Sequence, residues 1–274
     1  MNNLKALKLL IKYPKIVKNN GLVMAEQIEF KNRLYSEYKV KQLPTIDLLD
    51  LFPNLEIDIN TYSFLSGTSL ITDMVLLKSL ANRFKECSYL EIGSWRGESL
   101  ANVASVADNC TSLSLSSDEM RAMNLSNEFI KVHGVFSEKI DRITKIGHNS
   151  HTYEFSNLNK KFDLIFIDGA HSYKGVLNDT QKTFPLRKEN KSIIVWHDYS
   201  YNTEDVRYST LKAILDGIPK SKHNNLYHVS NTMCAIYIED INLPTTFTSF
   251  PTFPNKLFSL TLKAKKMQFE PNNQ

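Results

Sequence analysis

The sequence contains few cysteines and no long apolar run, and each absence argues against a class of protein. The three cysteines, Cys87, Cys110 and Cys234, are far apart and include no C-x-x-C pair. Such spacing argues against a disulfide framework and against a zinc knuckle, so we expect the thiols to lie free in the core. No apolar run approaches the roughly 18 residues that a membrane-spanning helix needs.

The N-terminal region lacks the uninterrupted apolar segment of a secretory signal, because Lys5, Lys8, Lys12 and Lys15 divide it. We therefore expect a cytoplasmic protein. The composition, 42% hydrophobic and 23% charged residues, is typical of a globular protein. The chain also contains no internal repeat and no low-complexity tract.

Positive charge is concentrated at the start of the chain. Residues 1–42 contain nine lysines and arginines against three glutamates, whereas the whole chain has a net charge of +4. The apolar residues of segment 4–17 lie on one helical face, with Pro14 bending the helix: Leu4, Leu7, Leu10, Ile11 and Val17. Two interpretations stay open for this basic arm. It lies on an anionic membrane surface as a peripheral contact, or it packs on its own domain or on a second subunit of a homo-oligomer.

The stretch Tyr89–Gly97 predicts a strand, a tight loop and a helix start. An apolar run containing Glu91 leads into Gly93, and after Gly97 a helical pattern begins at Glu98. Glycines let the backbone turn sharply and approach a ligand without Cβ atoms in the way. The order acid-x-Gly-x-x-x-Gly differs from the G-x-G-x-x-G of dinucleotide sites, so we expect another nucleotide-like ligand.

Strands and helices alternate through the middle of the chain. Continuous apolar runs at 162–167 and 192–196 indicate strands buried on both faces of a parallel sheet, and 111–115 a further strand. Helical spacing predicts helices over 22–42, 69–84 and 176–186. We also expect an extended piece at 129–135, and a helix through Ile140, Ile143 and Ile146.

This alternation predicts an α/β fold, a doubly wound and mostly parallel sheet. Segments 226–230 and 233–238 predict an antiparallel hairpin at one edge. We expect three regions: a helical N-terminal arm and wrapping segment (1–60), the core (61–240) and a C-terminal docking tail (241–274), with 256–267 as one amphipathic element.

Two predicted strands end in side chains that can bind a metal ion or transfer a proton. The strand at 162–167 ends in Asp168, with His171 three residues later, and the strand at 192–196 ends in His197 and Asp198. Because the carboxyl ends of parallel strands meet at one edge of a sheet, we expect both clusters to lie beside the Gly93 loop.

Three stretches together resemble a known family: YLEIGSWRGES, FDLIFIDGAHSYKGVLND and IIVWHDY. They are similar to a bacterial class I family of S-adenosylmethionine (SAM)-dependent methyltransferases, related to the macrocin-type O-methyltransferases and the cephalosporin-hydroxylase-like proteins. The resemblance covers roughly residues 66–240. It implies a Rossmann-like core that binds SAM and transfers its methyl group.

The resemblance also implies site residues. The SAM-binding set would be Glu91, Gly93, Ser94, Trp95, Gly97, Ser116, Asp118, Asn149, Ser150 and Asp168. Within it, Ser116 stands where the family has an acid for the ribose, with Asp118 two residues later, and Asn149 stands in place of an Asp near the adenine. These two replacements favour an alternative, a degenerate binding or scaffold protein without turnover.

Metal-dependent relatives hold Mg²⁺ with an Asp and an acidic pair at the positions of Asp168, His197 and Asp198. His197 departs from an all-oxygen set and suits Mn²⁺ or Fe²⁺ better, or is no ligand at all. His171 or His197 would be the base that removes the acceptor's proton. A further alternative from the same residues is a metal-dependent hydroxylase or hydrolase.

The expected function is therefore SAM-dependent O-methyl transfer to a hydroxyl of a small molecule or a glycan, assisted by a divalent cation if one binds. Nucleic acid is a poor candidate partner, because the basic residues lie in the arm and no platform of interleaved aromatic and basic residues is evident.

Overall fold

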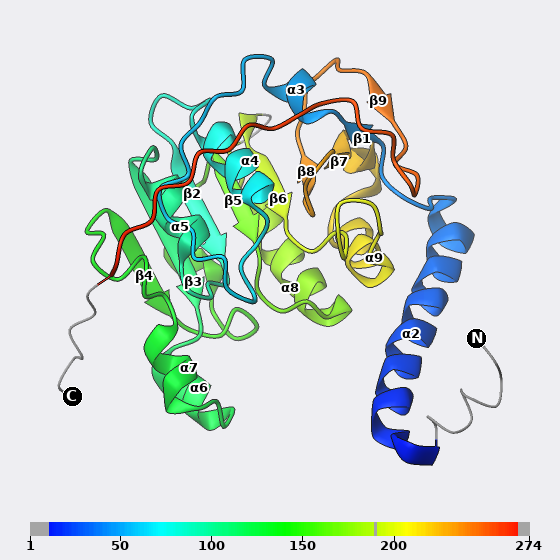
Figure 1. Cartoon of the computed structure of the whole chain (residues 1–274), viewed down its shortest axis with the longest axis horizontal. Coiled ribbons are helices and arrows are strands. Elements are labelled where there is room, and N and C mark those ends of the chain that lie inside the picture. Colours follow the sequence, from blue (N-terminus) through cyan, green and yellow to red (C-terminus); the bar gives the residue numbers. More distant parts are fainter. Residues whose placement is uncertain (1–10, 189–190, 268–274) are drawn as a thin grey trace.

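The computed structural model describes residues 11–188 and 191–267. Within these ranges the core is a nine-stranded sheet in the order β4-β3-β2-β5-β6-β8-β7-β1-β9 (Figure 1). The strands are β1 (Thr45–Ile46), β2 (Ser88–Ile92), β3 (Asn109–Ser114), β4 (Ile143–Gly147), β5 (Leu164–Ile167), β6 (Ile193–Trp196), β7 (Leu226–Val229), β8 (Ala235–Tyr237) and β9 (Thr245–Thr246). Strands β4, β3, β2, β5 and β6 are parallel, and β8 runs antiparallel to both β6 and β7.

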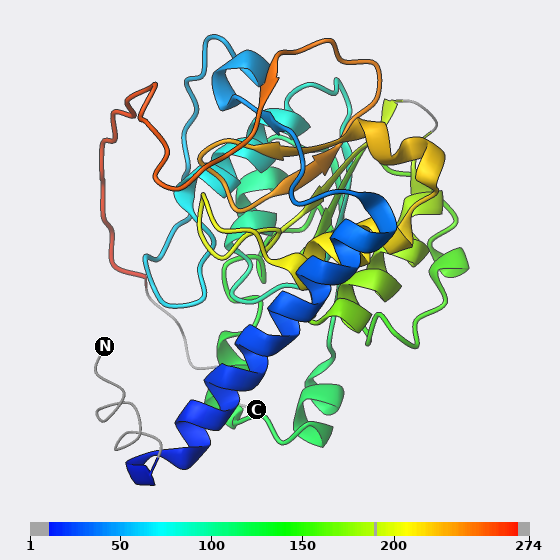
Figure 2. The same ribbon diagram turned by 90° about the vertical axis from the view of Figure 1, so that its right-hand side faces the viewer.

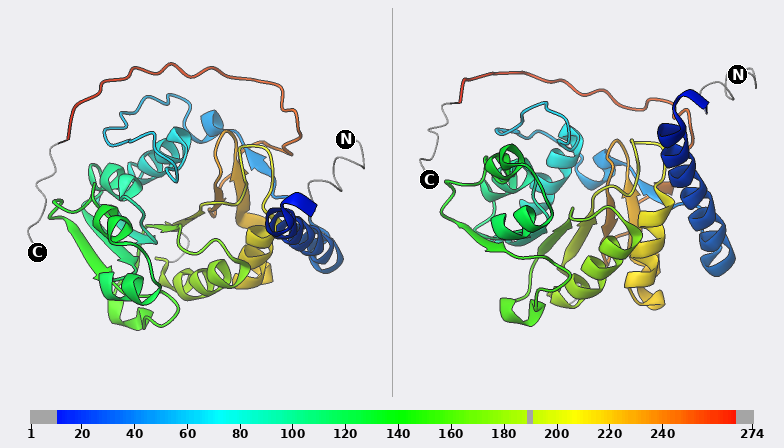
Figure 3. Two further views of the ribbon diagram at one scale, coloured as in Figure 1. Left: turned by 60° about the horizontal axis from the view of Figure 1, so that its bottom comes forward. Right: turned by 90° about the horizontal axis from the view of Figure 1, so that it is seen from below.

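Helices cover both faces of the sheet, as a doubly wound fold requires (Figure 3). They are α2 (Pro14–Tyr38), α3 (Leu48–Leu51), α4 (Ile71–Ala81), α5 (Glu98–Ala104), α6 (Ser117–Ala122), α7 (Asn127–Val132), α8 (Tyr173–Thr183) and α9 (Tyr208–Gly217), with 3₁₀ turns at Phe155–Leu158, Phe184–Leu186 and Lys220–Asn225. One core cluster packs α4 and α5 on the sheet, and the other packs α2, α8 and α9 on the opposite face.

Side-chain alternation along the strands divides the core between these two clusters. In β2, Tyr89 belongs to the α4/α5 side, whereas Leu90 and Ile92 belong to the α8/α9 side. Strands β5 and β6 are buried at every position, which explains their uninterrupted apolar sequences.

The fold class predicted from the sequence is confirmed, but two local predictions are wrong. Residues 129–132 are the end of helix α7 and not an extended piece. Segment 143–147 is strand β4 and not part of a helix. The three isoleucines at intervals of three fit a helix, but β4 is an outer strand in which only Ile143 is buried, so its sequence has no continuous apolar run.

The sheet extends beyond the predicted hairpin. Strand β1, from the segment expected only to wrap the core, pairs in parallel with β7, and β9 pairs antiparallel with β1. Beyond β9 the chain crosses the molecule in an extended path (Figure 1). Its side chains Leu257, Leu260 and Leu262 are 97%, 65% and 72% exposed. Residues 256–267 form neither helix nor strand, and Lys256 contacts Asp47 at 2.7 Å. A docking role of this tail stays a prediction.

Helix α2 lies on α9 through its second half. Phe30 and Leu34 are buried, and Gln27 Nε2 donates to Ser209 Oγ at 3.0 Å. The first half projects past the body of the molecule, and Met24 and Ile28 are exposed (Figure 2). The predicted apolar face of Leu4, Leu7 and Leu10 lies outside the described residues. Contact with a membrane or with a second subunit stays a prediction.

The three cysteines are free and buried, as predicted. Among the described helices, none is both long enough and apolar enough to cross a membrane.

Candidate functional site

Strand order reverses at β2, which has β3 and β4 on one side and β5 and β6 on the other. In open α/β sheets, ligands bind beyond the carboxyl ends of the strands at this reversal. A cavity of about 710 Å³ lies there. Its wall combines residues that follow β2, β3, β5 and β6 with segments 67–69 and 148–151 and with Met233.

The loop after β2 closes one side of the cavity. Gly93 has a φ of +87°, and a Cβ atom on it would lie 2.1 Å from the carbonyl oxygen of Asp168. Gly97, the N-cap of α5, has a φ of +85°, and a Cβ there would lie 2.7 Å from Ser137 Oγ. Both positions require glycine. The loop after β2 and the loop after β5 are thus in direct backbone contact.

The structure brings most of the predicted site residues to this cavity. Those in its wall are Gly93, Ser94, Trp95, Asn149, Ser150, Asp168, His171, His197 and Asp198. Those outside it are Glu91, Gly97, Ser116 and Asp118.

Glu91, which belongs to the expected SAM-binding set, does not line the cavity. Side chains alternate along β2, so the Glu91 carboxyl faces α5 and not the cavity. Its two oxygens accept hydrogen bonds from Tyr89 Oη at 2.6 Å and from Ser99 Oγ at 2.9 Å. Burial raises the pKa of Glu91 to about 8, since these hydroxyls only partly replace water and Asp168 repels the charge. The group is therefore an uncharged structural acid at neutral pH.

Ser116 and Asp118, also in the expected SAM-binding set, do not line the cavity either. Ser116 is the N-cap of α6, and its hydroxyl takes part in a capping box with Glu119. Asp118 is exposed and pairs with Arg121 at 2.7 Å. Glu119 was not predicted: it accepts a hydrogen bond from the Asn149 backbone N–H at 2.9 Å and so links α6 to the loop at 148–151. No carboxylate from the region after β3 lines the cavity.

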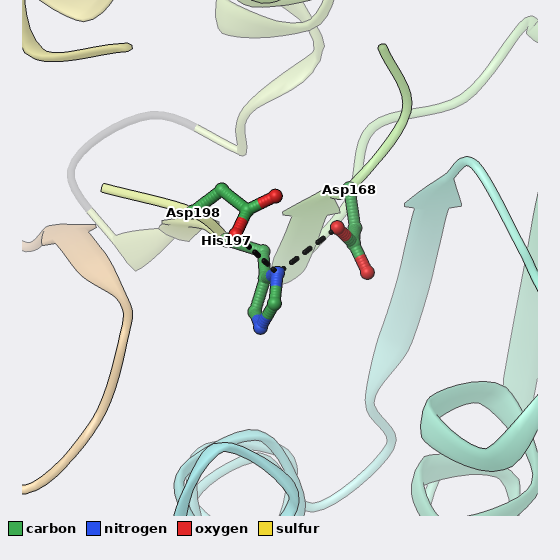
Figure 4. A group of neighbouring side chains, drawn as sticks. All are labelled: Asp168, His197 and Asp198. Atoms are coloured by element: carbon green, nitrogen blue, oxygen red, sulfur yellow. Dashed lines mark ion pairs between the residues drawn. The ribbon is translucent and has the colours of Figure 1, made fainter. Parts of the chain in front are cut away.

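The predicted metal-binding residues Asp168, His197 and Asp198 do come together. His197 Nδ1 lies 3.1 Å from Asp168 Oδ1 and 3.7 Å from Asp198 Oδ1, so both carboxylates face the same ring nitrogen (Figure 4). One ligand atom from each residue lies within 4.8 Å of the others. His197 is 8% exposed, and its Nδ1 has no hydrogen-bond partner of acceptable geometry. A buried ring nitrogen facing two carboxylate oxygens fits a divalent cation.

The electrostatics of this cluster are dominated by its carboxylates. Burial by itself lowers the pKa of His197, but Asp168, Asp198 and Asp73 outweigh it and raise that pKa well above its usual value. Burial likewise raises the pKa of Asp198, whereas the hydrogen bond from His171 and the charge of the nearby His197 imidazole lower it by more, so the net shift is downward.

His171 and Asp198 form a pair at the mouth of the cavity. His171 Nδ1 lies 2.5 Å from Asp198 Oδ2, and this hydrogen bond raises the pKa of His171. Arg207 Nη1 lies 3.3 Å from the same oxygen. The imidazole of His171 is 57% exposed. A carboxylate that orients a partly exposed imidazole is the arrangement of a general base.

Two charged residues in contact with the cluster were not predicted. Arg207, just before α9, holds Asp198, and Asp73, on α4, lies 3.2 Å from His197 Nε2. Neither belongs to a strand-end motif, so no local sequence signal marks it.

An aromatic pair encloses the cavity on the side of α7. The rings of Trp95 and Phe129 have centroids 4.1 Å apart, and both residues line the wall. Trp95 Nε1 would lie 3.3 Å from a Cβ at Gly67, so the loop at 67–69 packs closely against this ring. Trp95 thus links the Gly93 loop to the loop at 67–69.

Comparison with known proteins gives a family match for the segment that supplies most of the cavity wall. Residues 90–199 match a family model described as a methyltransferase domain. No curated protein matches the sequence. The finer resemblance to macrocin-type and cephalosporin-hydroxylase-like proteins stays a prediction.

Solved structures of low sequence identity are similar over part of the chain. A putative caffeoyl-CoA O-methyltransferase from Staphylococcus aureus is 18% identical, with a TM-score of 0.44 and coverage of 62% of this chain and 85% of that one. An O-methyltransferase from Bacillus cereus in complex with SAH is 14% identical, with a TM-score of 0.44 and coverage of 70% and 87%. An O-methyltransferase of tomaymycin synthesis from Streptomyces achromogenes, in complex with SAM, is 12% identical, with a TM-score of 0.42 and coverage of 62% and 81%.

Proposed function

We propose, from the premise that residues 90–199 are a SAM-dependent methyltransferase domain, that the protein transfers the methyl group of SAM to a hydroxyl of a small molecule or a glycan. One observation carries the proposal. The glycine loop expected to approach the cofactor and the cluster of Asp168, His171, His197 and Asp198 line the same cavity of about 710 Å³.

The cofactor supplies a sulfonium group that is already activated, so the protein must mainly align it and remove a proton. Gly93, Ser94 and Trp95 would lie along SAM on the β2 side, and Asn149 and Ser150 on the side of the loop at 148–151. The acceptor oxygen would attack the methyl carbon while the carbon–sulfur bond breaks. The bonding electrons stay on sulfur, and the neutral thioether SAH leaves.

His171 is the candidate base for the acceptor's proton. Its Nδ1 is held by Asp198, and Arg207 fixes that carboxylate in turn. The second ring nitrogen, Nε2, is then the atom that takes the hydroxyl proton as the new carbon–oxygen bond forms. General-base catalysis of this kind contributes about 10²- to 10⁴-fold to a rate.

Asp168, His197 and Asp198 would hold a divalent cation beside the acceptor. When bound, the cation would lower the pKa of the acceptor hydroxyl and orient its oxygen. Asp198 can serve both roles, because its Oδ1 faces His197 and its Oδ2 faces His171.

One observation favours a second candidate, a protein that binds SAM without turnover. No acid after β3 lines the cavity, since Ser116 caps α6 and Asp118 is exposed. A ribose without a charged acceptor loses a hydrogen bond of roughly 1.5–3 kcal/mol, which weakens SAM binding.

Thermal unfolding with SAM and with SAH, each with Mn²⁺, Mg²⁺ or EDTA, tests cofactor binding. SAM at about 100 times its dissociation constant stabilises by about 2.7 kcal/mol, which is roughly 5–10 °C for a chain of this size. SAH formation with a panel of hydroxyl acceptors then tests turnover. An unchanged unfolding temperature at millimolar SAM would refute the proposal. A raised unfolding temperature without SAH formation would favour the second candidate, a protein that binds SAM without turnover. Tightly held iron or zinc without a SAM shift would point to a hydroxylase or hydrolase.

Variants link the test to the cavity. Asp168→Ala should abolish SAH formation. Asp163→Asn is the matched control, because Asp163 is a buried carboxylate that accepts from Ser88 N and pairs with Lys188, away from the cavity wall.

A further inference from the structure

A buried carboxylate reaches the candidate metal site from outside the matched methyltransferase segment. Asp73 lies on α4, before residue 90, and is fully buried. Its Oδ2 lies 3.2 Å from His197 Nε2. Asp73 does not line the cavity, so it can act there only through the imidazole of His197.

The other contacts of Asp73 decide which atom donates in this pair. Oδ2 also accepts a hydrogen bond from the Leu70 backbone N–H at 2.8 Å. Oδ1 accepts from the Met233 N–H at 2.9 Å and from Cys234 Sγ at 3.5 Å. Every neighbour is a donor, and an ionised carboxylate only accepts. The His197 contact is therefore made with a proton on Nε2.

With its proton on Nε2, the neutral imidazole carries a lone pair on Nδ1. Nδ1 is the buried atom without a hydrogen-bond partner, and it faces Asp168 Oδ1 and Asp198 Oδ1. A lone pair beside two carboxylate oxygens is repulsive unless a proton or a metal ion lies among the three atoms, and a metal ion that binds there takes the place of the proton. The arrangement is a carboxylate that orients a histidine whose other nitrogen faces a metal position.

We propose that Asp73 is a positioning residue that holds His197 with Nδ1 as a metal ligand, and that the site selects a divalent transition ion over Mg²⁺. The inference rests on the metal site of the proposed function and names the class of ion it takes. Imidazole nitrogen suits Mn²⁺, Fe²⁺, Co²⁺ and Zn²⁺, whereas Mg²⁺ takes oxygen ligands.

The variant Asp73→Asn separates positioning from simple packing. It keeps the size of the side chain but replaces one oxygen by an amide that donates. Because both oxygens face donors, the amide must point at Leu70 and His197 or at Met233 and Cys234. When the amide points toward His197, it donates to Nε2, so the imidazole proton moves to Nδ1 and the lone pair that would bind the ion is lost.

The experiment is a titration of the EDTA-treated full-length protein with Co²⁺, followed by its visible absorption and repeated in competition with Mg²⁺. Wild type should prefer Co²⁺ by about tenfold or more. Asp73→Leu leaves Nε2 without an acceptor and should lose about 10- to 100-fold in Co²⁺ affinity, and Asp73→Asn should lose as much where its amide faces His197. The control Asp163→Asn, a buried carboxylate away from the cavity wall, should bind Co²⁺ like wild type.

Equal affinity of wild type for Mg²⁺ and Co²⁺, or unchanged Co²⁺ affinity in both Asp73→Asn and Asp73→Leu, overturns the inference. If Asp73→Asn does not fold, His197→Asn decides: an oxygen donor should bring the two affinities together, and unchanged selectivity refutes the role of Nδ1. The SAM-induced thermal shift of the metal-free protein is measured alongside. A SAM shift without metal binding refutes this inference alone, and selective metal binding without a SAM shift refutes the proposed function alone.

Discussion

Two carboxyl groups lie near the carboxyl ends of strands β2 and β6, and their surroundings give them different charge states. Glu91 is enclosed by the hydroxyls of Tyr89 and Ser99, and its pKa rises to about 8. Asp198 is also largely buried, but two histidines and Arg207 surround it and its pKa falls.

The difference shows that burial alone does not decide the charge of a carboxyl group. Water is removed from both groups, and desolvation raises both pKa values. Cationic partners compensate for it only at Asp198. Glu91 links β2 to α5 through Ser99, whereas Asp198 lines the cavity.

The largest expected effect lies on the Asp198 side of this comparison. Asp198→Asn removes the charge that holds His171 and Arg207, so SAH formation should fall by about 10²- to 10⁴-fold. Initial rates with an acceptor from the hydroxyl panel measure it. Glu91→Gln is the counterpart and should keep SAM affinity within about threefold, because the group lies outside the cavity. If Glu91→Gln lost as much SAH formation as Asp198→Asn, the distinction between the two carboxyl groups would be contradicted.

The second prediction concerns the pH dependence of stability. The folded protein keeps the Glu91 proton up to about pH 8, whereas the unfolded chain loses it near 4.5. The unfolded state therefore binds fewer protons in this window. The Glu91 contribution is complete below about pH 4.5 and is lost as pH rises through about 8.

Urea denaturation of wild type and Glu91→Gln at pH 5, 6, 7 and 8 measures this contribution. The free energy of unfolding of wild type, relative to the variant, should fall by up to about 4 kcal/mol across the series. Parallel pH profiles would mean that Glu91 is ionised in the folded protein, like Asp198.

The smallest effect is expected for Lys182, whose ammonium group contacts the backbone of the loop at 148–151 and no side chain of the site. Lys182 Nζ donates to the carbonyls of Ser150 at 2.9 Å and His151 at 2.7 Å, and so fixes the loop at 148–151. Lys182→Met should weaken SAM binding by about 3- to 10-fold, as expected for the loss of about one hydrogen bond. Calorimetric titration with SAM measures it. Lys161→Met, whose amine donates to the Pro185 carbonyl away from the cavity, should leave the affinity unchanged.

The sequence allowed the doubly wound fold and much of the site to be predicted because both depend on strand ends. Asp168, His197 and Asp198 each follow a buried strand, and parallel pairing brings such ends together. The direction of Glu91 could not be read from its motif, since it depends on which helices cover each face of β2. Asp73 and Arg207 reach the cluster from a helix and a loop that carry no motif, so only the folded chain reveals them.

The pairing of β1 with β9 also has a consequence for biosynthesis. Thr45 and Ile46 lie beside Thr246 and Thr245, so this edge joins segments about 200 residues apart. A ribosome releases the segment that contains β1 long before the segments that contain β7 and β9. Strand β1 can therefore pair only after β7, and then β9, has been synthesised. During that interval the neighbouring Leu48 and Leu51, buried in the finished protein, lack part of their final cover. Premature termination before residue 245 would leave β1 as an open edge, the kind of surface that recruits strands from other chains.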